Sequence, residues 1–338
     1  MQQLLPKFIV VAGVLLGIIA YVASNIFQYL HEPVMFDEAI TIELKPGSSI
    51  RTLSNQLQSH NLLEHPDYFL IWGRLSGKAT RLQAGEYVFS PGQAISELID
   101  DMVAGRVRQY SLTLVEGWTF REFLNAVAAH DAIEHTLKDT AYDDIMSVLG
   151  HEGEHPEGRF FPDTYFIHKN TRDTALLNRA YQQMEMHLNR LWSERDDKLP
   201  FKSPYEALIM ASIVEKESAV AEERPVIAGV FINRLRKGMR LQTDPTVIYG
   251  IGESYDGDIR FKDLRTDTPY NTYTRKGLTP TPIAMPGLGA LEAVMHPADT
   301  EYLYFVATGD GSGRHVFSST LEAHEKAVDK YQRKRNKS

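Results

Sequence analysis

Apolar residues form one long run near the N-terminus of the chain. Residues 8–23 contain no strongly polar side chain, and the apolar stretch resumes at residues 26–27. In a helix that rises 1.5 Å per residue, about 20 residues cover the ~30 Å hydrocarbon core of a bilayer. The pattern therefore predicts a transmembrane anchor over residues 8–29, and no other stretch of the sequence reaches spanning length.

Charged residues lie unevenly on the two sides of this run. Lys7 and the amino terminus precede it, and acidic residues follow it at positions 32, 37 and 38. The positive-inside rule therefore predicts a cytoplasmic tail of residues 1–7 and a single-pass protein of the cytoplasmic (inner) membrane, with its main part on the periplasmic face. A signal peptide cleaved at residues 22–24 is the alternative, but the apolar run exceeds the usual length of about 7–15 residues.

Shorter patterns follow a tether at residues 31–39. The predicted elements are strands at 41–44 and 85–89 and helices at 50–63, 66–75 and 94–103. Ser48 and Ser49 can cap the first of these helices, and Pro66 suits the start of the second. These elements predict a small α+β domain over residues 40–106.

The pattern starts again after this domain. A strand is expected at residues 111–115, and residues 128–200 are predicted to be mainly helical, broken by the proline-rich aromatic stretch 156–165. No period of 20–50 residues repeats, which excludes a solenoid. Residues 111–335 are therefore expected to form one larger, mixed domain, and the whole chain an α+β protein.

Composition limits the classes of function. The chain has 338 residues, 43% hydrophobic and 24% charged, enough for about two domains. Its net charge of −8 argues against nucleic acid as a partner, and the only dense basic run lies in the tail at 333–337. The absence of cysteine removes disulfides, thiolate nucleophiles and Cys-ligated zinc. No cofactor is expected, because nucleotide cofactors are scarce outside the membrane.

Two short motifs are set aside. Residues 151–155 read His-Glu-Gly-Glu-His, which matches the zincin pattern, but that chemistry needs a helix, and glycines and a proline surround these residues. A solvated loop is favoured over a zinc site, so no metal is expected. The glycine-rich residues 309–313 follow an apolar strand at 302–306 and are interpreted as a hairpin turn.

A helix with strong start signals carries two candidate carboxyl groups. Residues 203–206, Ser-Pro-Tyr-Glu, form a capping box with proline at the first helical position and predict a helix that continues to residue 220. With 3.6 residues per turn, Glu217 falls on an apolar stripe near the helix end. Glu215 projects about 200° away from it.

Partial burial would raise the pKa of such a carboxyl, so that it stays protonated and can donate a proton near pH 7. The alternative is an ion pair with Arg224, Arg234 or Arg236, and the pattern leaves both interpretations open. Further along, Asp244-Pro245 is expected to cap another helix, and the loop 265–287 mixes uncharged polar, aromatic and proline residues. That composition suits a neutral, hydroxyl-rich ligand such as a sugar chain.

Several segments resemble the endolytic murein transglycosylases, the YceG-like family. The resemblance covers nearly the whole chain and is carried by residues 156–165, 213–218, 231–235, 241–250, 279–283 and 302–307. It implies a LysM-like, peptidoglycan-binding domain at 40–106 and a transglycosylase domain at 111–335 with a helical core like that of lytic transglycosylases. The family usually has Trp where this chain has Arg159, which puts a substrate contact there in doubt.

The resemblance also implies a reaction, the cleavage of the β-1,4 bond between N-acetylmuramic acid and N-acetylglucosamine to leave a 1,6-anhydro end. Glu217 is implied as the single catalytic residue, acid first and base afterwards. Possible contacts to the glycan strand are Gln242, Thr243, Asp244, Tyr249, Asn271 and Tyr273, with Asp244 also the candidate for a second carboxylate. Peptidoglycan synthases are possible partners, and the expected role is to end the elongation of nascent strands.

Three other functions remain open from the sequence. A peptidoglycan-binding scaffold would cleave nothing, a hydrolytic muramidase would release reducing ends, and a zinc peptidase would be inhibited by chelators.

Overall fold

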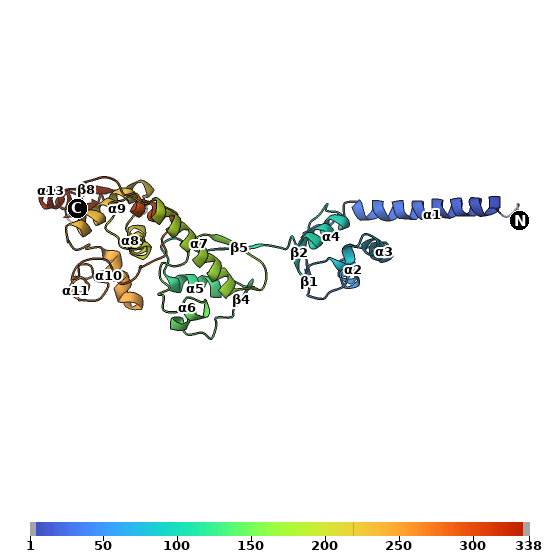
Figure 1. The fold of residues 1–338 in the computed structure, drawn as a ribbon, viewed down its shortest axis with the longest axis horizontal. Coiled ribbons are helices and arrows are strands. Elements are labelled where there is room, and N and C mark those ends of the chain that lie inside the picture. Colours follow the sequence, from blue (N-terminus) through green and yellow to red (C-terminus); the bar gives the residue numbers. More distant parts are fainter. Residues whose placement is uncertain (1–4, 219, 334–338) are drawn as a thin grey trace. The chain divides into compact units, whose positions relative to one another are not determined.

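Residues 5–218 and 220–333 are described by a computed structural model. They form two compact units (Figure 1), a first that runs to Tyr110 and includes His168–Asn170, and a second made of the remainder. Helices and short strands occur in both, which confirms the predicted α+β class. Parts of two predictions, the tail at 1–7 and the basic run at 333–337, lie outside the described residues.

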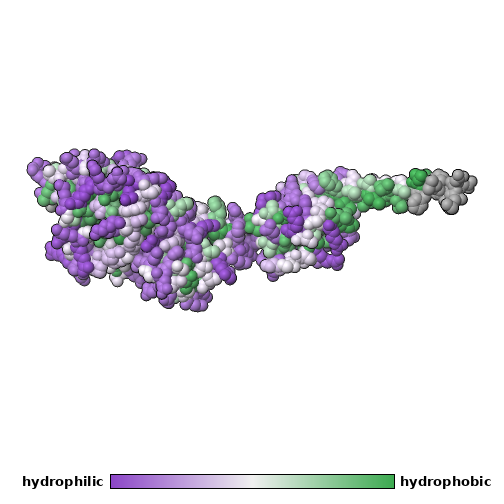
Figure 2. Space-filling model, viewed as in Figure 1, coloured by the Kyte–Doolittle hydropathy of each residue, from purple (hydrophilic) through white to green (hydrophobic). Residues whose placement is uncertain are grey.

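Helix α1 (Leu5–His31) begins the chain. Over Ile9–His31 it is long and apolar enough to cross a membrane, and it is the only such helix among the described residues. Most of its large apolar side chains are exposed, and Figure 2 shows them as a continuous hydrophobic surface. The helix is consistent with the predicted single-pass anchor.

The last turns of α1 belong to the folded core of unit 1. Ile26 and Leu30 are buried there, and Leu30 is fully shielded from solvent. The hydroxyl of Tyr29 accepts hydrogen bonds from the backbone N–H groups of Glu64 (2.8 Å) and His65 (3.2 Å). The apolar helix therefore passes directly into the unit rather than ending at a free tether.

Unit 1 contains the elements that its sequence predicts. They are β1 (Ile40–Leu44), α2 (Ile50–Ser59), α3 (Pro66–Leu75), β2 (Gly85–Phe89) and α4 (Ile95–Ala104). Helix α2 ends four residues before the predicted position 63, and the 3-10 turn η1 (Lys78–Thr80) was not predicted. The two strands pair antiparallel, with Ile42 opposite Tyr87, and both side chains are buried. The Ser49 side chain caps α2 by accepting from the backbone N–H of Thr52, as predicted.

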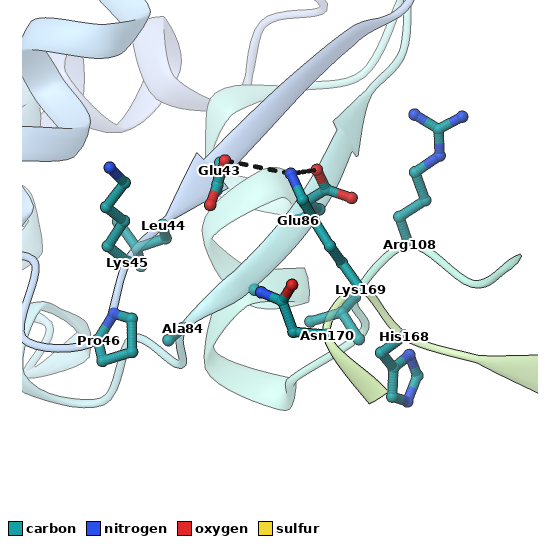
Figure 3. A pocket seen from close by; sticks show the side chains of 12 residues that line it. Glu43, Leu44, Lys45, Pro46, Ala84, Glu86, Arg108, His168, Lys169 and Asn170 are labelled. Atoms are coloured by element: carbon teal, nitrogen blue, oxygen red, sulfur yellow. Dashed lines mark hydrogen bonds and ion pairs between the residues drawn. The ribbon is translucent and has the colours of Figure 1, made fainter. Parts of the chain in front are cut away.

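A short segment from much later in the chain completes unit 1. Lys169 Nζ lies 2.6 Å from a carboxylate oxygen of Glu86 and 3.4 Å from one of Glu43 (Figure 3). The Tyr110 hydroxyl donates to Glu86 at 2.6 Å. Burial alone would raise the pKa of Glu86, but the bonds from Lys169 and Tyr110 outweigh it and lower that pKa. A cavity of about 270 Å³, lined in part by Arg108, lies beside this cluster.

Unit 2 contains short strand pairs around a group of helices. Its strands are β3 (Tyr110–Thr113), β4 (Ile133–Glu134), β5 (Thr164–Ile167), β6 (Thr171–Arg172), β7 (Tyr304–Ala307) and β8 (His315–Ser318), paired β3–β5, β4–β6 and β7–β8. Its α-helices are α5 (Phe120–Ala128), α6 (Ile145–Val148), α7 (Asp173–Glu194), α8 (Pro204–Glu217), α9 (Arg224–Arg236), α10 (Asp244–Ile251), α11 (Phe261–Arg265), α12 (Leu288–Met295) and α13 (Leu321–Val328). Short helical turns are η2 (Tyr142–Asp144), η3 (Ala221–Glu223), η4 (Gly252–Ser254) and η5 (Asp329–Arg333).

The prediction that residues 128–200 are mainly helical is wrong for the first half of that range. Only α7 is long, and residues 129–172 are mostly turns and loops with the short strands β4, β5 and β6 and the one-turn helix α6. Gly150, Gly153 and Gly158 have φ values of +88°, +81° and +79°, which a helix cannot contain. The His-Glu-Gly-Glu-His segment lies in one of these turns, so its predicted loop conformation is confirmed.

Helix α8 lies at the centre of unit 2. Residues 207–214 are all buried, and α7, α9 and α12 pack around them. The expected single apolar stripe is therefore wrong, because this helix is surrounded by core on every side. Its one buried hydroxyl is satisfied, since Ser212 donates to the Ile209 carbonyl and accepts from the N–H of Ile283. The helix ends at Glu217, three residues earlier than predicted.

The C-terminal part of unit 2 is a hairpin followed by a helix. Strands β7 and β8 pair antiparallel, and the glycine-rich segment 309–313 turns between them, as predicted. Thr320 caps α13, which packs against both strands.

Truncation of Leu30 should loosen unit 1. Because the side chain is fully buried, we expect Leu30→Ala to cost about 2–5 kcal/mol of the stability of this unit. Hydrogen–deuterium exchange of the full chain in detergent should show faster exchange in peptides from residues 40–104. Ile19→Ala, at a position that is 62% exposed on the same helix, is the control. Equal exchange in the two variants would contradict the prediction.

Candidate active site

Glu217 is the last residue of α8 and lies at the wall of a cavity within unit 2. The Thr243 hydroxyl donates a hydrogen bond to its carboxyl Oε1. Thr243 itself is almost fully buried and is held by the Thr272 hydroxyl, which accepts from its N–H at 3.1 Å, and by Thr246, which donates to its carbonyl at 2.8 Å. The Thr243 hydroxyl that holds the Glu217 carboxyl is therefore itself held in place by Thr272 and Thr246.

The local turn explains how Thr243 reaches this place. Gln242 has φ of +52°, a left-handed conformation that reverses the chain just before α10. Thr243 is the residue before the helix, and Asp244 and Pro245 occupy its first turn. The expectation that Asp244 caps α10 is therefore wrong by one residue, and its carboxyl is available to the cavity.

The cavity has a volume of about 480 Å³ and is open to solvent. Its polar and aromatic lining comes from α8, α9, the segment before α10, the loop at 273, the β7–β8 hairpin and the C-terminal helices. The lining residues with polar side chains are Glu217, Arg234, Gln242, Asp244, Tyr273, Tyr304, His315, His324 and Gln332.

The environment of Glu217 favours its protonated form. Burial raises the pKa of this carboxyl, and the negative charge of Asp244 raises it further. The hydrogen bond from Thr243 and the positive charges of His315 and Arg234 lower the same pKa but do not cancel the effect of burial. A carboxyl that stays protonated at a cavity wall can donate a proton to a bound molecule.

Glu215 has a different environment. Arg224 approaches one of its oxygens at 2.9 Å, and the backbone N–H of Gly287 donates to the other at 3.0 Å. Its side chain is only 5% exposed. The ion-pair interpretation therefore applies to Glu215, whereas the described residues include no ion-pair partner for Glu217 within bonding distance.

Three more predicted residues share the cavity with Glu217. Gln242, Asp244 and Tyr273 all line it, and the Tyr273 hydroxyl donates to an oxygen of Asp244 at 2.5 Å. Burial and this bond to a carboxylate raise the pKa of Tyr273, so that it remains a donor. Asp244 therefore has one oxygen engaged by Tyr273.

The other two predicted residues lie elsewhere in unit 2. Asn271 is buried, and its side-chain amide donates to three backbone carbonyls between residues 263 and 266, which fixes the loop before Tyr273. The Tyr249 hydroxyl donates to the buried Glu157 at 3.0 Å. Neither belongs to the described lining of the cavity.

Arg159, at the position where the resemblance led us to expect tryptophan, also makes contacts within the protein. Its guanidinium lies 3.2 Å from Glu185 and 4.5 Å from the ring centre of Tyr205. It is also 3.5 Å from Glu154. Through these contacts the Arg159 side chain links α7 to α8.

Sequence reasoning missed the part of the cavity wall that comes from the hairpin. Tyr304, His315 and His324 are brought to Glu217 from about 90–110 residues later in the chain, and no local pattern pointed to them. Arg234 was considered only as an ion-pair partner. Its guanidinium donates instead to the carbonyls of Leu303 (2.6 Å) and Leu241 (2.5 Å), which joins the hairpin to the segment before α10.

The described residues contain no group of three or more His, Cys, Asp or Glu side chains arranged to hold a metal ion.

Comparison with known proteins identifies the family of the chain. The chain belongs to the YceG-like family, whose model matches residues 42–330. The endolytic murein transglycosylase of Bacillus subtilis (strain 168) is 33% identical over 328 residues, which cover 89% of this chain and 88% of that protein. The family resemblance inferred from the sequence is thereby confirmed.

Two further relatives extend the comparison. The endolytic murein transglycosylase of Streptococcus pneumoniae serotype 2 (strain D39) is 27% identical over 89% of this chain and 61% of its own length. A crystal structure of a yceG-like protein from Listeria monocytogenes superposes with a TM-score of 0.54 at 30% identity, covering 86% of this chain and 99% of that one.

The buried Glu157 predicts a pH-dependent stability. Burial raises its pKa from 4.5 to about 7, although Phe120 N–H and the Tyr249 hydroxyl both donate to it. Because the folded-state pKa lies above the unfolded value, the stabilisation by this proton is complete below pH 4.5 and is lost as the pH rises through 7. We expect this group to lower the free energy of unfolding by up to about 3 kcal/mol over that window.

Denaturant unfolding at pH 4.5 and pH 8 measures this effect. Glu157→Gln, which stays neutral, should flatten the pH dependence relative to the wild type. Glu301→Gln, at an exposed position, is the control and should leave the dependence unchanged. An identical slope in Glu157→Gln and the wild type would show that Glu157 does not titrate in this range.

Proposed function

We propose that this protein is an endolytic murein transglycosylase that cuts peptidoglycan glycan strands. Relatives of that name are similar to it over most of its length. The observation that carries the proposal is the carboxyl of Glu217, which lies at the wall of an open cavity and whose pKa is raised by burial. Polar side chains suited to sugar hydroxyls, among them Gln242 and Tyr273, surround it.

The proposed reaction is a non-hydrolytic cleavage of the bond between N-acetylmuramic acid and N-acetylglucosamine. Glu217 gives its proton to the glycosidic oxygen as the bond to the anomeric carbon breaks. The 6-hydroxyl of the muramyl residue then closes on that carbon and loses its proton, which leaves a 1,6-anhydro end. The Glu217 carboxylate that the first step leaves behind can accept this proton. One residue can therefore serve first as the acid and then as the base.

The surroundings of Asp244 support a mechanism that needs no second catalytic carboxylate. One of its oxygens accepts from Tyr273, and it approaches the cavity from the exposed first turn of α10. In this role Asp244 raises the pKa of Glu217 by its charge and holds the Tyr273 hydroxyl at the cavity wall. A hydrolytic muramidase would instead use Asp244 to activate water, and would leave reducing ends.

The location completes the proposal. Helix α1, which is long and apolar enough to cross a membrane, is proposed as a single-pass anchor in the cytoplasmic membrane, with the residues that follow it on the periplasmic face. The small domain at 40–106 is proposed as a LysM-like peptidoglycan-binding domain, and the domain at 111–335 as the transglycosylase. An enzyme so placed would meet nascent strands beside peptidoglycan synthases and end their elongation.

The first test compares two neighbouring carboxyls. With uncrosslinked glycan strands and full-length protein in detergent, we expect the wild type to release 1,6-anhydro ends, which mass spectrometry distinguishes from reducing ends by one water. Glu217→Gln should lower the rate by about 100-fold or more, because it cannot donate the proton. Glu215→Gln should lower the thermal stability by breaking the ion pair with Arg224, but retain the chemistry.

Each result has a separate meaning. Reducing ends from the wild type would make the protein a hydrolase, with Asp244 as the second carboxylate to test. No cleavage by folded wild-type protein would favour the non-catalytic peptidoglycan-binding scaffold. Loss of cleavage in Glu215→Gln, with normal rates in Glu217→Gln, would reverse the assignment of the acid.

A further inference from the structure

Helix α3 carries apolar side chains on two faces. Phe69 and Gly73 are buried on the face toward the core of unit 1, where a Cβ at position 73 would clash with the side chain of Ile50. A second stripe, which we name the outer stripe, has the i, i+3, i+4, i+7 spacing of one helix face and consists of Tyr68, Ile71, Trp72 and Leu75. Two of its side chains lie at the surface, since Ile71 is 44% and Leu75 is 83% exposed. A helix that is apolar on both faces is expected to be covered on both.

The element beside this helix is α1. The ring of Tyr29, in the last turns of α1, meets the ring of Tyr68 edge to face, with 6.0 Å between centroids. The Tyr29 hydroxyl holds the backbone N–H groups of Glu64 and His65, which directly precede α3. In Figure 1, α3 lies beside the last turns of α1 and reaches further along α1 than the other elements of unit 1 do. Helix α3 is therefore fixed at one end to the apolar helix.

The depth of α1 in a bilayer determines where α3 lies. Counted from Ile9, the start of the stretch that can span, about 20 residues cover the ~30 Å hydrocarbon core, and the headgroup layer beyond it is about 5–8 Å thick. Tyr29 comes directly after these residues. Because Ile26 and Leu30 are part of the core of unit 1, no spacer separates this unit from the bilayer surface. A helix that is held at Tyr29 then lies at the level of the headgroups.

The side chains around the outer stripe are of the types that membrane surfaces favour. Tyrosine and tryptophan are enriched at this level, because each ring has an apolar body and a polar tip. Arg74 is exposed in the last turn of α3, and Lys78 Nζ lies 4.8 Å from the ring centre of Trp72. Lys78 also pairs with Asp100 at 2.5 Å, and Asp67 lies in the first turn of α3, off the stripe. Basic groups next to an apolar surface suit anionic lipid headgroups.

We propose that the outer stripe of α3 is a membrane-binding surface, which inserts Ile71, Trp72 and Leu75 among the headgroups of the periplasmic leaflet. The proposal rests on the anchoring through α1 proposed above and adds a second contact with the same bilayer. Lipid is the occupant because the stripe lies beside the helix that spans the lipid. A spanning helix alone lets unit 1 rotate about the helix axis, whereas a second contact fixes which side of unit 1 faces the bilayer.

Spin labels on the full-length protein test this contact. The chain contains no cysteine, so each single substitution creates one labelling site. Ile71→Cys and Leu75→Cys, each carrying a nitroxide, are reconstituted in vesicles of phosphatidylcholine and phosphatidylglycerol in equal parts. EPR power saturation then measures how often the label collides with oxygen, which concentrates in lipid, and with a water-soluble nickel chelate. We expect a ratio of oxygen to nickel collisions several times higher at both positions than at a water-exposed site.

The chain offers two matched controls. Val88 is an exposed valine of β2, at the opposite end of unit 1 from α3 in Figure 1, and the label of Val88→Cys should collide freely with the chelate. Ile18 is 55% exposed on α1, and the label of Ile18→Cys reports the anchor itself. That label should collide with oxygen and hardly with the chelate.

The outcomes separate the surface from the anchor. Frequent nickel collisions at positions 71 and 75, with the lipid pattern at position 18, would overturn the membrane-binding surface and leave the anchor in place. Rare collisions with both reagents at 71 and 75 would mean that protein covers the stripe, which also overturns the proposal. Frequent nickel collisions at position 18 would refute the proposed anchoring. Because Leu75 is 83% exposed, Leu75→Cys answers the question alone if Ile71→Cys does not fold.

Discussion

The burial of α8 on every side is the constraint on which unit 2 depends. Residues 207–214 have no solvent-facing side, so the helix is fixed by its neighbours and can present polar groups only at its ends. Glu215 and Glu217 both lie at the C-terminal end, where the core meets solvent. The first is paired with Arg224 and a backbone N–H, although burial still raises its pKa, while the second accepts a hydrogen bond from the hydroxyl of Thr243 and has no ion-pair partner among the described residues. Desolvation of the second carboxyl therefore goes largely uncompensated, and this is the physical origin of its raised pKa.

The features of the fold that a few adjacent residues determine were predicted from the sequence. The caps at Ser49 and Ser203, the start of α3 at Pro66 and the hairpin turn at 309–313 depend on a few adjacent residues, and all were predicted correctly. Helicity over residues 129–172 was predicted wrongly, because isolated glycines with positive φ break the chain into turns regardless of the apolar spacing around them. The single apolar face expected for α8 failed for another reason, since burial on all sides depends on packing partners that are distant in sequence.

The residues of the candidate site were likewise predicted where a local motif marks them and missed where distant segments of the chain meet. Glu217, Gln242 and Asp244 came from motifs near the ends of predicted helices and Tyr273 from the predicted loop 265–287, and the four residues meet at one cavity. Asn271 of that loop fixes the loop backbone instead of facing the cavity, and Tyr249 of α10 contacts a buried acid. The wall made by the hairpin could not be predicted, because nothing local relates residues 304–315 to a helix that ends about 90 residues earlier.

The buried acid Glu157 connects the stability of unit 2 to this cavity. Its two oxygens accept from the first N–H of α5 and from Tyr249 on α10, so it joins these helices in the core. The first turn of α10 carries Asp244, and the residue before it is Thr243, which holds Glu217. Glu157, whose carboxyl is costly to bury, therefore fixes α10. Helix α10 in turn positions the groups around Glu217, a second carboxyl that is costly to bury. A protonated Glu157 retains only one oxygen with full acceptor strength. The strength of its hydrogen bond to Tyr249 on α10 therefore depends on the charge of Glu157, although Glu157 is not among the residues that line the cavity.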